Sequence, residues 1–270
     1  VVLYRTRCGQ VAVLEDACCH RKLPLSMGVL IEDRIQCGYH GLEFDCSGAC
    51  VKIPIQDKIP PKAKVRSFPV AEKWGLIWLW MGDPAAADAS KIINVEHYED
   101  SSWGVNRGPM MTIDCDYRYM ADNLLDPEHV SYVHKTSLGN KDCVGVPLDV
   151  EVGDAKVVCS RWIMDCVLAP FFQPYVQFEG KADRLQHYEV QIPSHAIIKD
   201  IIAPAGSGAP LGQLHEKAFL LDSYNFITPI NKDQCMYFWF QVRNFKPRCK
   251  ETDELLTMDF QAAFDEDRQF

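Results

Sequence analysis

Two histidines and two aspartates lie close together in the middle of the chain: Asp122, Asp126, His129 and His134. Two imidazoles and one carboxylate are the ligand set of a non-haem Fe(II) site with positions left open for oxygen. Cysteine, which softer metals prefer, does not occur between residues 122 and 134. The same spacing also occurs in ordinary helices with surface histidines, so its meaning depends on what the rest of the chain provides.

A second group of metal-binding residue types lies near the N-terminus. Cys18 and His20 are followed by Cys37 and His40, so each of two short loops offers one thiol and one imidazole. A Rieske [2Fe–2S] cluster has this composition, because two cysteines hold one iron and two histidines hold the other. A tetrahedral Cys2His2 zinc site is the alternative interpretation. Cys19 is an alternative ligand, but Cys18 gives the more symmetric pair of loops.

Short strands are the elements expected to position these loops. Apolar runs separated by turn-forming Gly and Pro occur at residues 1–4, 11–14, 34–37, 42–44 and 75–80. Residues 82–88 have the composition of a linker. We therefore expect an all-β domain over residues 1–84, followed by an α+β domain over residues 85–270. The chain begins within a strand pattern and ends within a helix pattern, so we expect both domains to be truncated.

The second domain mixes strand and helix patterns. Strands are predicted at residues 157–162, 185–192, 218–227 and 236–242, which indicates a large antiparallel sheet covered by helices. A helix predicted over residues 120–134 would place Asp122, Asp126 and His129 on one face. His134 would lie about 140° around that helix from His129. We therefore expect a π-bulge, a kink or a helix end between the two histidines.

The two motifs together resemble those of a known family. Cys18-x-His20 followed by Cys37-x2-His40 resembles the Rieske loops of the Rieske non-haem iron oxygenases. Asp126-x2-His129-x4-His134 resembles the mononuclear iron motif of the same enzymes. The flanking sequence is most similar to the group of vanillate O-demethylase, toluenesulfonate methyl-monooxygenase and dicamba O-demethylase. The resemblance covers essentially the whole chain and implies that Cys18, His20, Cys37 and His40 hold a [2Fe–2S] cluster.

The resemblance also implies roles for the acidic residues. His129 and His134 would hold a mononuclear Fe(II), with Asp267 as the third ligand and Asp265 as the second choice. Asp126 would not be a ligand. It would instead bridge His129 to His40 of a neighbouring subunit and carry electrons between subunits, in keeping with how carboxylates orient metal-bound imidazoles.

The implied function is that of the oxygenase component of an aromatic monooxygenase. It would take O2 as co-substrate and electrons from NAD(P)H through a flavin/iron–sulfur reductase or a ferredoxin. The substrate would be a small aromatic compound, and an acidic one is preferred. The reaction would be hydroxylation or O-demethylation. The resemblance implies a homotrimer, and head-to-tail contacts between subunits generate closed rings of this kind. The alternatives are a ring cis-dihydroxylating dioxygenase and a Rieske electron carrier with an attached binding domain.

Composition excludes several other classes. The formal net charge of −9 argues against nucleic-acid binding. No apolar run is long enough to span a membrane. Twelve cysteines without a regular framework indicate a reducing cytoplasm rather than disulfides. A substrate pocket should be mainly aromatic and apolar, and its candidate residues are Trp162, Phe171, Phe172, Asn225, Trp239 and Arg243.

Overall fold

The computed structural model describes residues 1–269, which form two compact units, Val1–Asn94 and the rest of the chain from Val95. The domain boundary that the sequence indicates, between residues 84 and 85, stays a prediction; the division of the structure into compact units falls after Asn94. The first unit contains eight short strands: β1 (Val2–Arg5), β2 (Val11–Leu14), β3 (Val29–Ile31), β4 (Arg34–Gln36), β5 (Glu43–Phe44), β6 (Cys50–Lys52), β7 (Val70–Lys73) and β8 (Leu76–Leu79).

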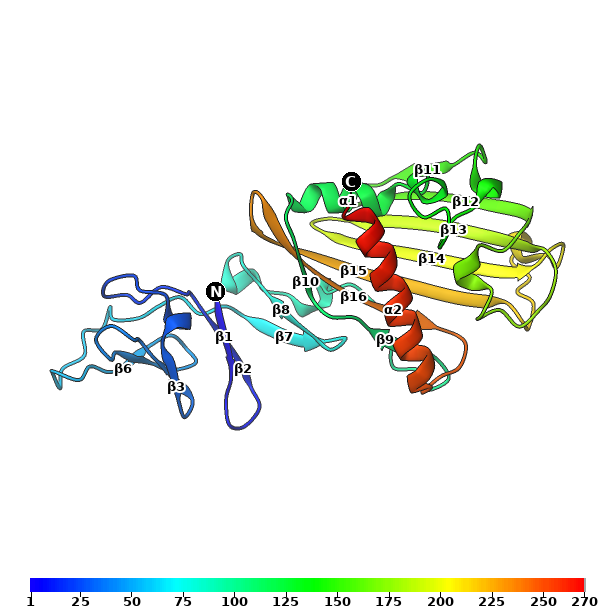
Figure 1. The fold of residues 1–270 in the computed structure, drawn as a ribbon. Helices are drawn as coiled ribbons and strands as arrows, with labels where there is room; N and C mark the ends of the chain where they lie inside the picture. Colours follow the sequence, from blue (N-terminus) through cyan, green and yellow to red (C-terminus); the bar gives the residue numbers. More distant parts are fainter. Residues whose placement is uncertain (270) are drawn as a thin grey trace. The chain divides into compact units, whose positions relative to one another are not determined.

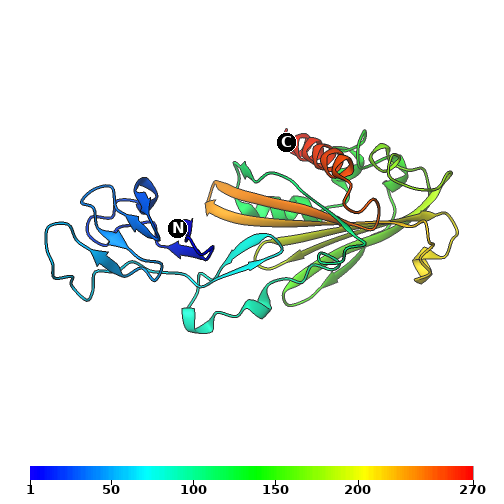
Figure 2. The same ribbon diagram turned by 90° about the horizontal axis from the view of Figure 1, so that it is seen from below.

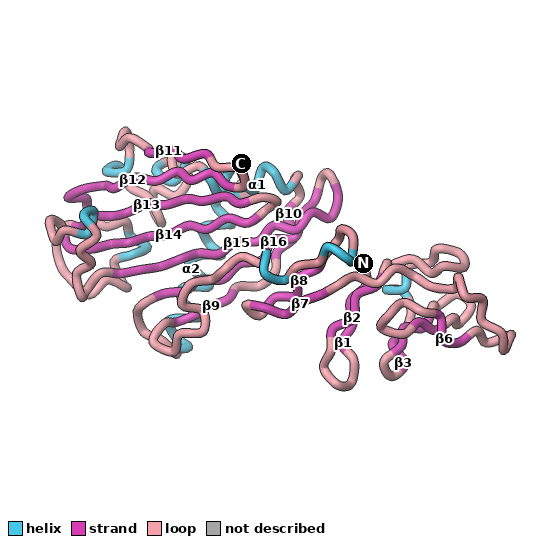
Figure 3. Tube along the Cα trace, turned by 180° about the vertical axis from the view of Figure 1, so that it is seen from behind, coloured by secondary structure: helices cyan, strands magenta, loops and turns pink. Residues whose placement is uncertain are grey.

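Short turns join β3 to β4 and β7 to β8, whereas longer loops connect β2 to β3 and β6 to β7 (Figure 3). β3 to β6 form a four-stranded antiparallel sheet in chain order, while β1 pairs with β2 and β7 with β8. Leu14, Leu25 and Phe44 are fully buried, and Cys18 and Cys37 belong to the same hydrophobic cluster. The predicted all-β character of this part of the chain is confirmed, and its core lies directly under the cysteine–histidine loops.

One antiparallel sheet of eight strands forms the second unit (Figure 1). The strand order is β10-β16-β15-β14-β13-β12-β11, and β9 pairs with the end of β16 beyond β10. The strands are β9 (Gly104–Arg107), β10 (Met111–Ile113), β11 (Asp149–Val152), β12 (Lys156–Cys166), β13 (Ala182–Gln191), β14 (His195–Pro204), β15 (Phe219–Asn231) and β16 (Gln234–Arg243). The predicted large antiparallel sheet is confirmed.

Two α-helices accompany the sheet, α1 (Tyr117–Leu125) and α2 (Lys250–Asp267). α1 contacts β12 to β15, and α2 lies on one face of the sheet (Figure 2). Leu256, Phe260 and Ala263 form the buried face of α2 at helical spacing. Short 3-10 turns are η1 (Leu25–Met27), η2 (Pro84–Ala86), η3 (Ala89–Lys91), η4 (His129–Ser131), η5 (Lys141–Cys143), η6 (Pro170–Phe172) and η7 (Ala209–Leu211).

The helix predicted over residues 120–134 was wrong in its extent. α1 ends at Leu125, and Asp126 has extended backbone angles (φ −92°, ψ 104°). The cause is Pro127, whose ring disfavours helical geometry at the residue before it. α1 therefore ends before both histidines, and the 3-10 turn η4, which begins at His129, ends before His134. Asp122, Asp126 and His129 do not share a helix face.

Membrane insertion through a helix finds no support within residues 1–269. No helix in this range combines the length and the apolar character that crossing a membrane requires.

Candidate metal centres

The two cysteine–histidine loops of the first unit have the same backbone hydrogen bonds. The N–H of Cys18 donates to the carbonyl of Leu23 over 2.9 Å, and the N–H of Cys37 donates to the carbonyl of Leu42 over 2.8 Å. Each loop is thus closed across its base by a bond from the cysteine itself. Because backbone groups make these hydrogen bonds, the shape of the two loops depends on the path of the backbone more than on any one side chain.

The loops also turn in the same way. Lys22 and Gly41 occupy equivalent places and donate their N–H groups to the carbonyls of Cys18 and Cys37, over 2.9 and 3.0 Å. Both have positive φ, 60° at Lys22 and 72° at Gly41. This correspondence pairs Cys18, and not Cys19, with Cys37. The geometric basis for choosing Cys18 is therefore a repeated turn rather than spacing alone.

The four donor side chains divide into a buried pair and an exposed pair. Cys18 and Cys37 are 1% and 2% exposed, whereas His20 and His40 are exposed and their ring centroids lie 4.7 Å apart. Burial raises the pKa of the Cys18 thiol to about 11, so its thiolate requires a cation beside it. Two inner thiols and two outer imidazoles fit a Rieske cluster, which binds one iron through each ligand type.

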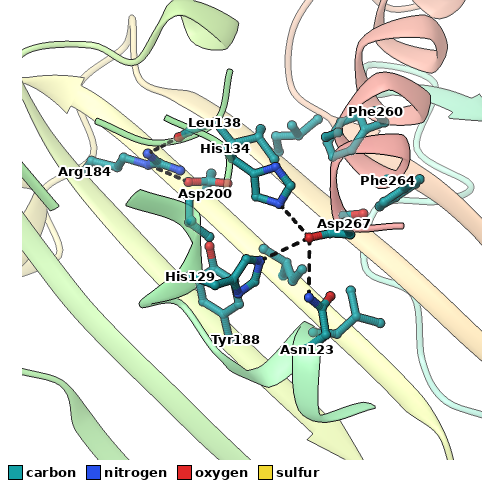
Figure 4. A pocket seen from close by; sticks show the side chains of 16 residues that line it. Asn123, His129, His134, Leu138, Arg184, Tyr188, Asp200, Phe260, Phe264 and Asp267 are labelled. Carbon is teal, nitrogen blue, oxygen red and sulfur yellow. Dashed lines mark hydrogen bonds and ion pairs between the residues drawn. The ribbon is translucent and has the colours of Figure 1, made fainter. Parts of the chain in front are cut away.

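A second set of donor atoms converges in the second unit (Figure 4). Oδ1 of Asp267 lies 3.6 Å from Nε2 of His129 and 3.1 Å from Nε2 of His134. The three ligand atoms all lie within 4.8 Å of one another. His129 begins η4, His134 follows that turn, and Asp267 ends α2. Two imidazoles and one carboxylate on one side of a cavity fit a facial Fe(II) site.

Asp265, the second choice for the third ligand, lies elsewhere. Its carboxylate is 57% exposed and 3.8 Å from the guanidinium of Arg268. It also accepts a hydrogen bond from the Gln261 amide over 3.3 Å. The amide of Asn123, which sequence reasoning did not single out, donates to Oδ1 of Asp267 over 3.4 Å. Its neighbour Asp122 is exposed.

The two histidines have different surroundings. Nδ1 of His134 lies 2.6 Å from Oε2 of Glu266, which also accepts a hydrogen bond from the hydroxyl of Ser137 over 2.8 Å. Burial lowers the pKa of His134, while hydrogen bonds to Asp267 and Glu266 raise it, and the net direction is upward. Nδ1 of His129 is buried and has no hydrogen-bond partner within residues 1–269.

Asp126 lies next to this unpaired nitrogen. Its Oδ2 is 3.7 Å from Nδ1 of His129, too long for a hydrogen bond, and its side chain is 50% exposed. Its other oxygen accepts a hydrogen bond from the N–H of Glu128 over 2.7 Å. Asp126 is therefore close enough to contact His129 after a small rotation, and open enough to contact a group outside this chain.

Arg161 on β12 holds the segment between Asp126 and His129 in place. Its side chain is fully buried. Nη1 donates to Glu128 over 2.7 Å and Nη2 to the carbonyl of Pro127 over 3.3 Å. Nε donates to the side chain of Gln186 on β13 over 2.8 Å. The sheet thus positions His129 through an arginine that looks like an ordinary strand residue in the sequence.

A cavity adjoins the triad between the helices and the sheet (Figure 4). Its floor consists of rows of side chains from β13, β14 and β15, since Tyr188 pairs with Ile198 and Ile198 with Ser223. Asp200 and Leu221 form the next row. Apolar groups dominate the lining: Leu124, Val130, Leu138, Ile198, Leu221, Phe260, Ala263 and Phe264. The polar lining residues include Asn123, Arg184, Tyr188, Asp200 and Ser223.

The charged pair in the cavity wall is internally matched. Nε of Arg184 donates to Oδ1 of Asp200 over 2.8 Å, and Nη1 donates to the carbonyl of Leu138 over 2.8 Å. The guanidinium carbon lies 4.4 Å from the ring centre of Phe172. Both charged side chains are at least nine-tenths buried. The cation is thus held by a carboxylate, a carbonyl and a ring at the cavity wall.

The pocket residues predicted from sequence were wrong. None of the six candidates lines this cavity. Phe171, Phe172, Asn225, Trp239 and Arg243 are buried in the core instead. Large aromatic side chains fill the space between sheet and helices, because their burial contributes most to folding. The true lining residues come from both helices, the turns after α1 and three strands, and no spacing in the sequence marks them as one group.

Comparison with known proteins agrees with this arrangement. The family model "Rieske [2Fe-2S] domain" matches residues 1–69, and "Vanillate O-demethylase oxygenase C-terminal domain" matches residues 113–270. The toluene-4-sulfonate monooxygenase system iron-sulfur subunit of Comamonas testosteroni is 36% identical over 99% of this chain and 78% of its own length. The vanillate O-demethylase oxygenase subunit of a Pseudomonas species is 35% identical over 99% and 76%.

Solved structures give the same result. The crystal structure of dicamba monooxygenase bound to dicamba superposes with a TM-score of 0.86 at 32% identity, covering 98% of this chain and 77% of the other. The dicamba O-demethylase oxygenase component of Stenotrophomonas maltophilia is 33% identical over 99% of this chain and 78% of its own length. A structure of dicamba monooxygenase with non-heme iron also matches, over 99% of this chain.

A Rieske [2Fe–2S] cluster and a mononuclear iron are therefore the cofactors that this chain carries. The similarity to these oxygenases, which covers nearly the whole chain, gives no support to a Cys2His2 zinc site or to a Rieske electron carrier with a binding domain. Nothing in the comparisons favours the cis-dihydroxylating dioxygenase. The chain belongs to the Rieske non-haem iron oxygenases, among the oxygenase components of the monooxygenases and O-demethylases.

Proposed function

We propose that this chain hydroxylates or O-demethylates a small aromatic substrate held in the cavity beside His129, His134 and Asp267. The observation that carries the proposal is the convergence of three ligand atoms within 4.8 Å beside an apolar cavity. When bound, the mononuclear Fe(II) supplies O2 activation and the [2Fe–2S] cluster supplies electrons. Cys18, His20, Cys37 and His40 hold the cluster in this proposal.

The residues of the chain perform the binding steps. Leu221 and Phe260 help to form an apolar wall that excludes water and orients an aromatic ring. Tyr188 on β13 and Ser223 on β15, on either side of β14, offer hydroxyl groups that can fix one edge of the substrate. Asn123 donates to Asp267 and keeps that carboxylate directed at the triad.

An acidic substrate is the first choice. The relatives named for vanillate and toluene-4-sulfonate act on aromatic anions, by those names. Arg184 is the cation of the cavity wall here, and it already pairs with Asp200. A substrate anion would have to share that guanidinium, so neutral analogues belong in any substrate test.

Electron delivery completes the proposal. We propose that a flavin/iron–sulfur reductase or a ferredoxin passes electrons from NAD(P)H to the cluster. Asp126 then bridges His129 to His40 of a neighbouring subunit, in a homotrimer. Support comes from the half-exposed carboxylate of Asp126 and the unpaired Nδ1 of His129 beside it. A cytoplasmic location is part of the proposal, because none of the twelve cysteines, all of which lie within residues 1–269, forms a disulfide.

The test is turnover of a substrate panel by the iron-loaded oxygenase with a reductase, NADH and O2. The panel pairs methoxy- and methyl-substituted benzoates and benzenesulfonates with neutral analogues of equal size, and formaldehyde and oxygen uptake are measured. We expect formaldehyde from a methoxy substrate. From a methyl substrate we expect an alcohol that contains one atom of the labelled O2. Labelled oxygen entering one product as a cis-diol would replace this proposal with the dihydroxylating alternative.

A further inference from the structure

The iron-binding histidines differ in what holds the far side of each ring. For His129, Nδ1 is buried without a hydrogen-bond partner within residues 1–269, and the nearest carboxylate oxygen is 3.7 Å away. For His134, Nδ1 is 2.6 Å from Oε2 of Glu266. The side chain of His134 is 3% exposed and that of Glu266 is 29% exposed. One ring is therefore fixed by this chain and the other is left adjustable.

We infer that Glu266 is a positioning residue for the mononuclear iron, acting through His134. The carboxylate accepts a hydrogen bond only from a protonated Nδ1, so it selects the tautomer whose lone pair is on Nε2. Nε2 is the nitrogen that faces Asp267, at 3.1 Å. Glu266 and Asp267 are adjacent at the end of α2, so one helix end supplies both an iron ligand and the group that orients another ligand.

Glu266 is itself held in position. The hydroxyl of Ser137 donates to the same Oε2 over 2.8 Å. The backbone of Ser137 is fixed on both sides, because its N–H donates to the carbonyl of His134 over 3.0 Å and its carbonyl accepts from Phe171 over 3.2 Å. Ser137 and His134 thus approach the carboxylate as one rigid turn. A carboxylate with two donors on one oxygen has little freedom to release the imidazole.

The turn that carries these donors is packed tightly against η4. A Cβ on Gly139 would lie 2.1 Å from the carbonyl oxygen of Val130, so no larger residue fits without backbone movement. The N–H of Gly139 donates to the carbonyl of His134 over 2.9 Å. Glu266 therefore acts on a ring whose backbone is already fixed, and its remaining contribution is ring orientation and tautomer.

The inference rests on the proposed function, in which His129, His134 and Asp267 bind the iron. It predicts an order of metal affinities that a general structural role for Glu266 does not. Glu266→Ala removes the acceptor. Glu266→Gln keeps an amide oxygen that can accept from Nδ1 but removes the charge. Asp265→Ala is the matched control, because it removes an exposed carboxylate from the same helix end.

The measurement is Co(II) affinity of the Rieske-loaded protein, after a chelator has emptied the mononuclear site. We expect Glu266→Ala to weaken binding by roughly 10- to 100-fold, as loss of such orienting groups does. Glu266→Gln should recover much of that loss, Ser137→Ala should weaken binding by a few-fold, and Asp265→Ala should have no effect. In the Zn(II)-loaded protein, 15N spectra of histidine should show protonated Nδ1 at His134 in the wild type and a loss of that signal in Glu266→Ala.

Each outcome decides the inference. Unchanged affinity in Glu266→Ala, with the Rieske absorption and thermal transition intact, overturns it, as does equal loss in Glu266→Gln and Glu266→Ala. If Glu266→Ala does not fold, Glu266→Gln and Ser137→Ala decide, since weakened binding supports the inference and wild-type binding by both overturns it. If His134→Ala and Asp267→Ala also bind Co(II) normally, the proposed iron site itself is wrong.

Discussion

The two metal centres of this protein are built in opposite ways. The cluster loops of the first unit lie close in sequence, repeat one backbone turn, and present exposed imidazoles above buried thiols. The triad of the second unit joins a turn after α1 to the end of α2, and Glu266 lies 132 residues after His134. The first centre depends on local chain path, and the second on the packing of distant elements. Substitutions should therefore act locally in one and at long range in the other.

The largest loss of iron and of activity is expected on substitution of Asp267, which reaches the two histidines from the end of α2. Asp267→Ala should remove the mononuclear iron and reduce turnover at least about 100-fold, because three protein ligands hold a catalytic site of this type. The Rieske absorption should persist. Metal analysis should then give about two irons per chain, those of the [2Fe–2S] cluster. Asp265→Ala should keep all the iron, and the reverse result would exchange the roles of these two aspartates.

An effect of similar size, confined to the first unit, is expected at Cys18. Cys18→Ser should abolish the Rieske spectrum, while Cys19→Ser should retain it, since the repeated turn pairs Cys18 with Cys37. Electron paramagnetic resonance of the dithionite-reduced protein separates the two. A retained signal in Cys18→Ser together with its loss in Cys19→Ser would show that the turn correspondence does not identify the ligand.

An intermediate effect is expected at Arg161, which carries tertiary contacts to the triad segment. Arg161→Ala should lower the free energy of unfolding of the second unit by roughly 3 kcal/mol, because buried partners lose a charged donor. Iron affinity should fall as well, since the carbonyl of Pro127 is no longer held. Denaturant unfolding followed by tryptophan fluorescence measures the first quantity.

The matched control for that variant is Lys156→Ala. Lys156 lies on the same strand, and its half-exposed side chain forms an ion pair with the largely buried Glu189 at 3.4 Å. Glu189 also contacts His187 and Gln191, so loss of the solvent-facing lysine should cost about 0–1 kcal/mol. Equal losses in the two variants would mean that Arg161 has no special role in holding the site.

The smallest effect tests the equivalence of the two loops. Gly41→Ala places a Cβ at positive φ, 3.0 Å from Cγ of Pro54, and should cost about 1–2 kcal/mol. Lys22→Gly relaxes a residue that already has φ of 60° and should raise stability by roughly 0.5 kcal/mol. Thermal bleaching of the Rieske absorption reports both. Destabilisation by Lys22→Gly would show that the lysine side chain, and not only its backbone, supports the loop.

Sequence reasoning identified the family where the chemistry is local. Cys18, His20, Cys37 and His40 form a pattern contained in two short loops, and His129 with His134 gained meaning from it. The extent of the helix around the iron motif was predicted wrongly although Pro127, which ends it, was visible in the sequence. That error came from giving periodicity more weight than the restriction that proline places on its predecessor.

Residues that act through tertiary contact could not be found in this way. Arg161 and Arg184 look like ordinary strand residues in the sequence, and only the neighbouring strands reveal that they are buried and paired. Glu266 was one acid in a run of three, and its role depends on which side of α2 faces His134. The aromatic residues proposed for the pocket were too large and too well placed for the core to be left beside a cavity.

The position of Asp267 at the end of α2 links metal binding to folding. An ion that joins Asp267 to His134 connects two residues more than 130 positions apart, which the unfolded chain does not hold together. Because the metal binds the folded state, its binding free energy adds to the stability of that state. Bound iron should therefore stabilise the packing of α2 against the sheet. Removal of the iron should make α2 the first element that a protease cleaves.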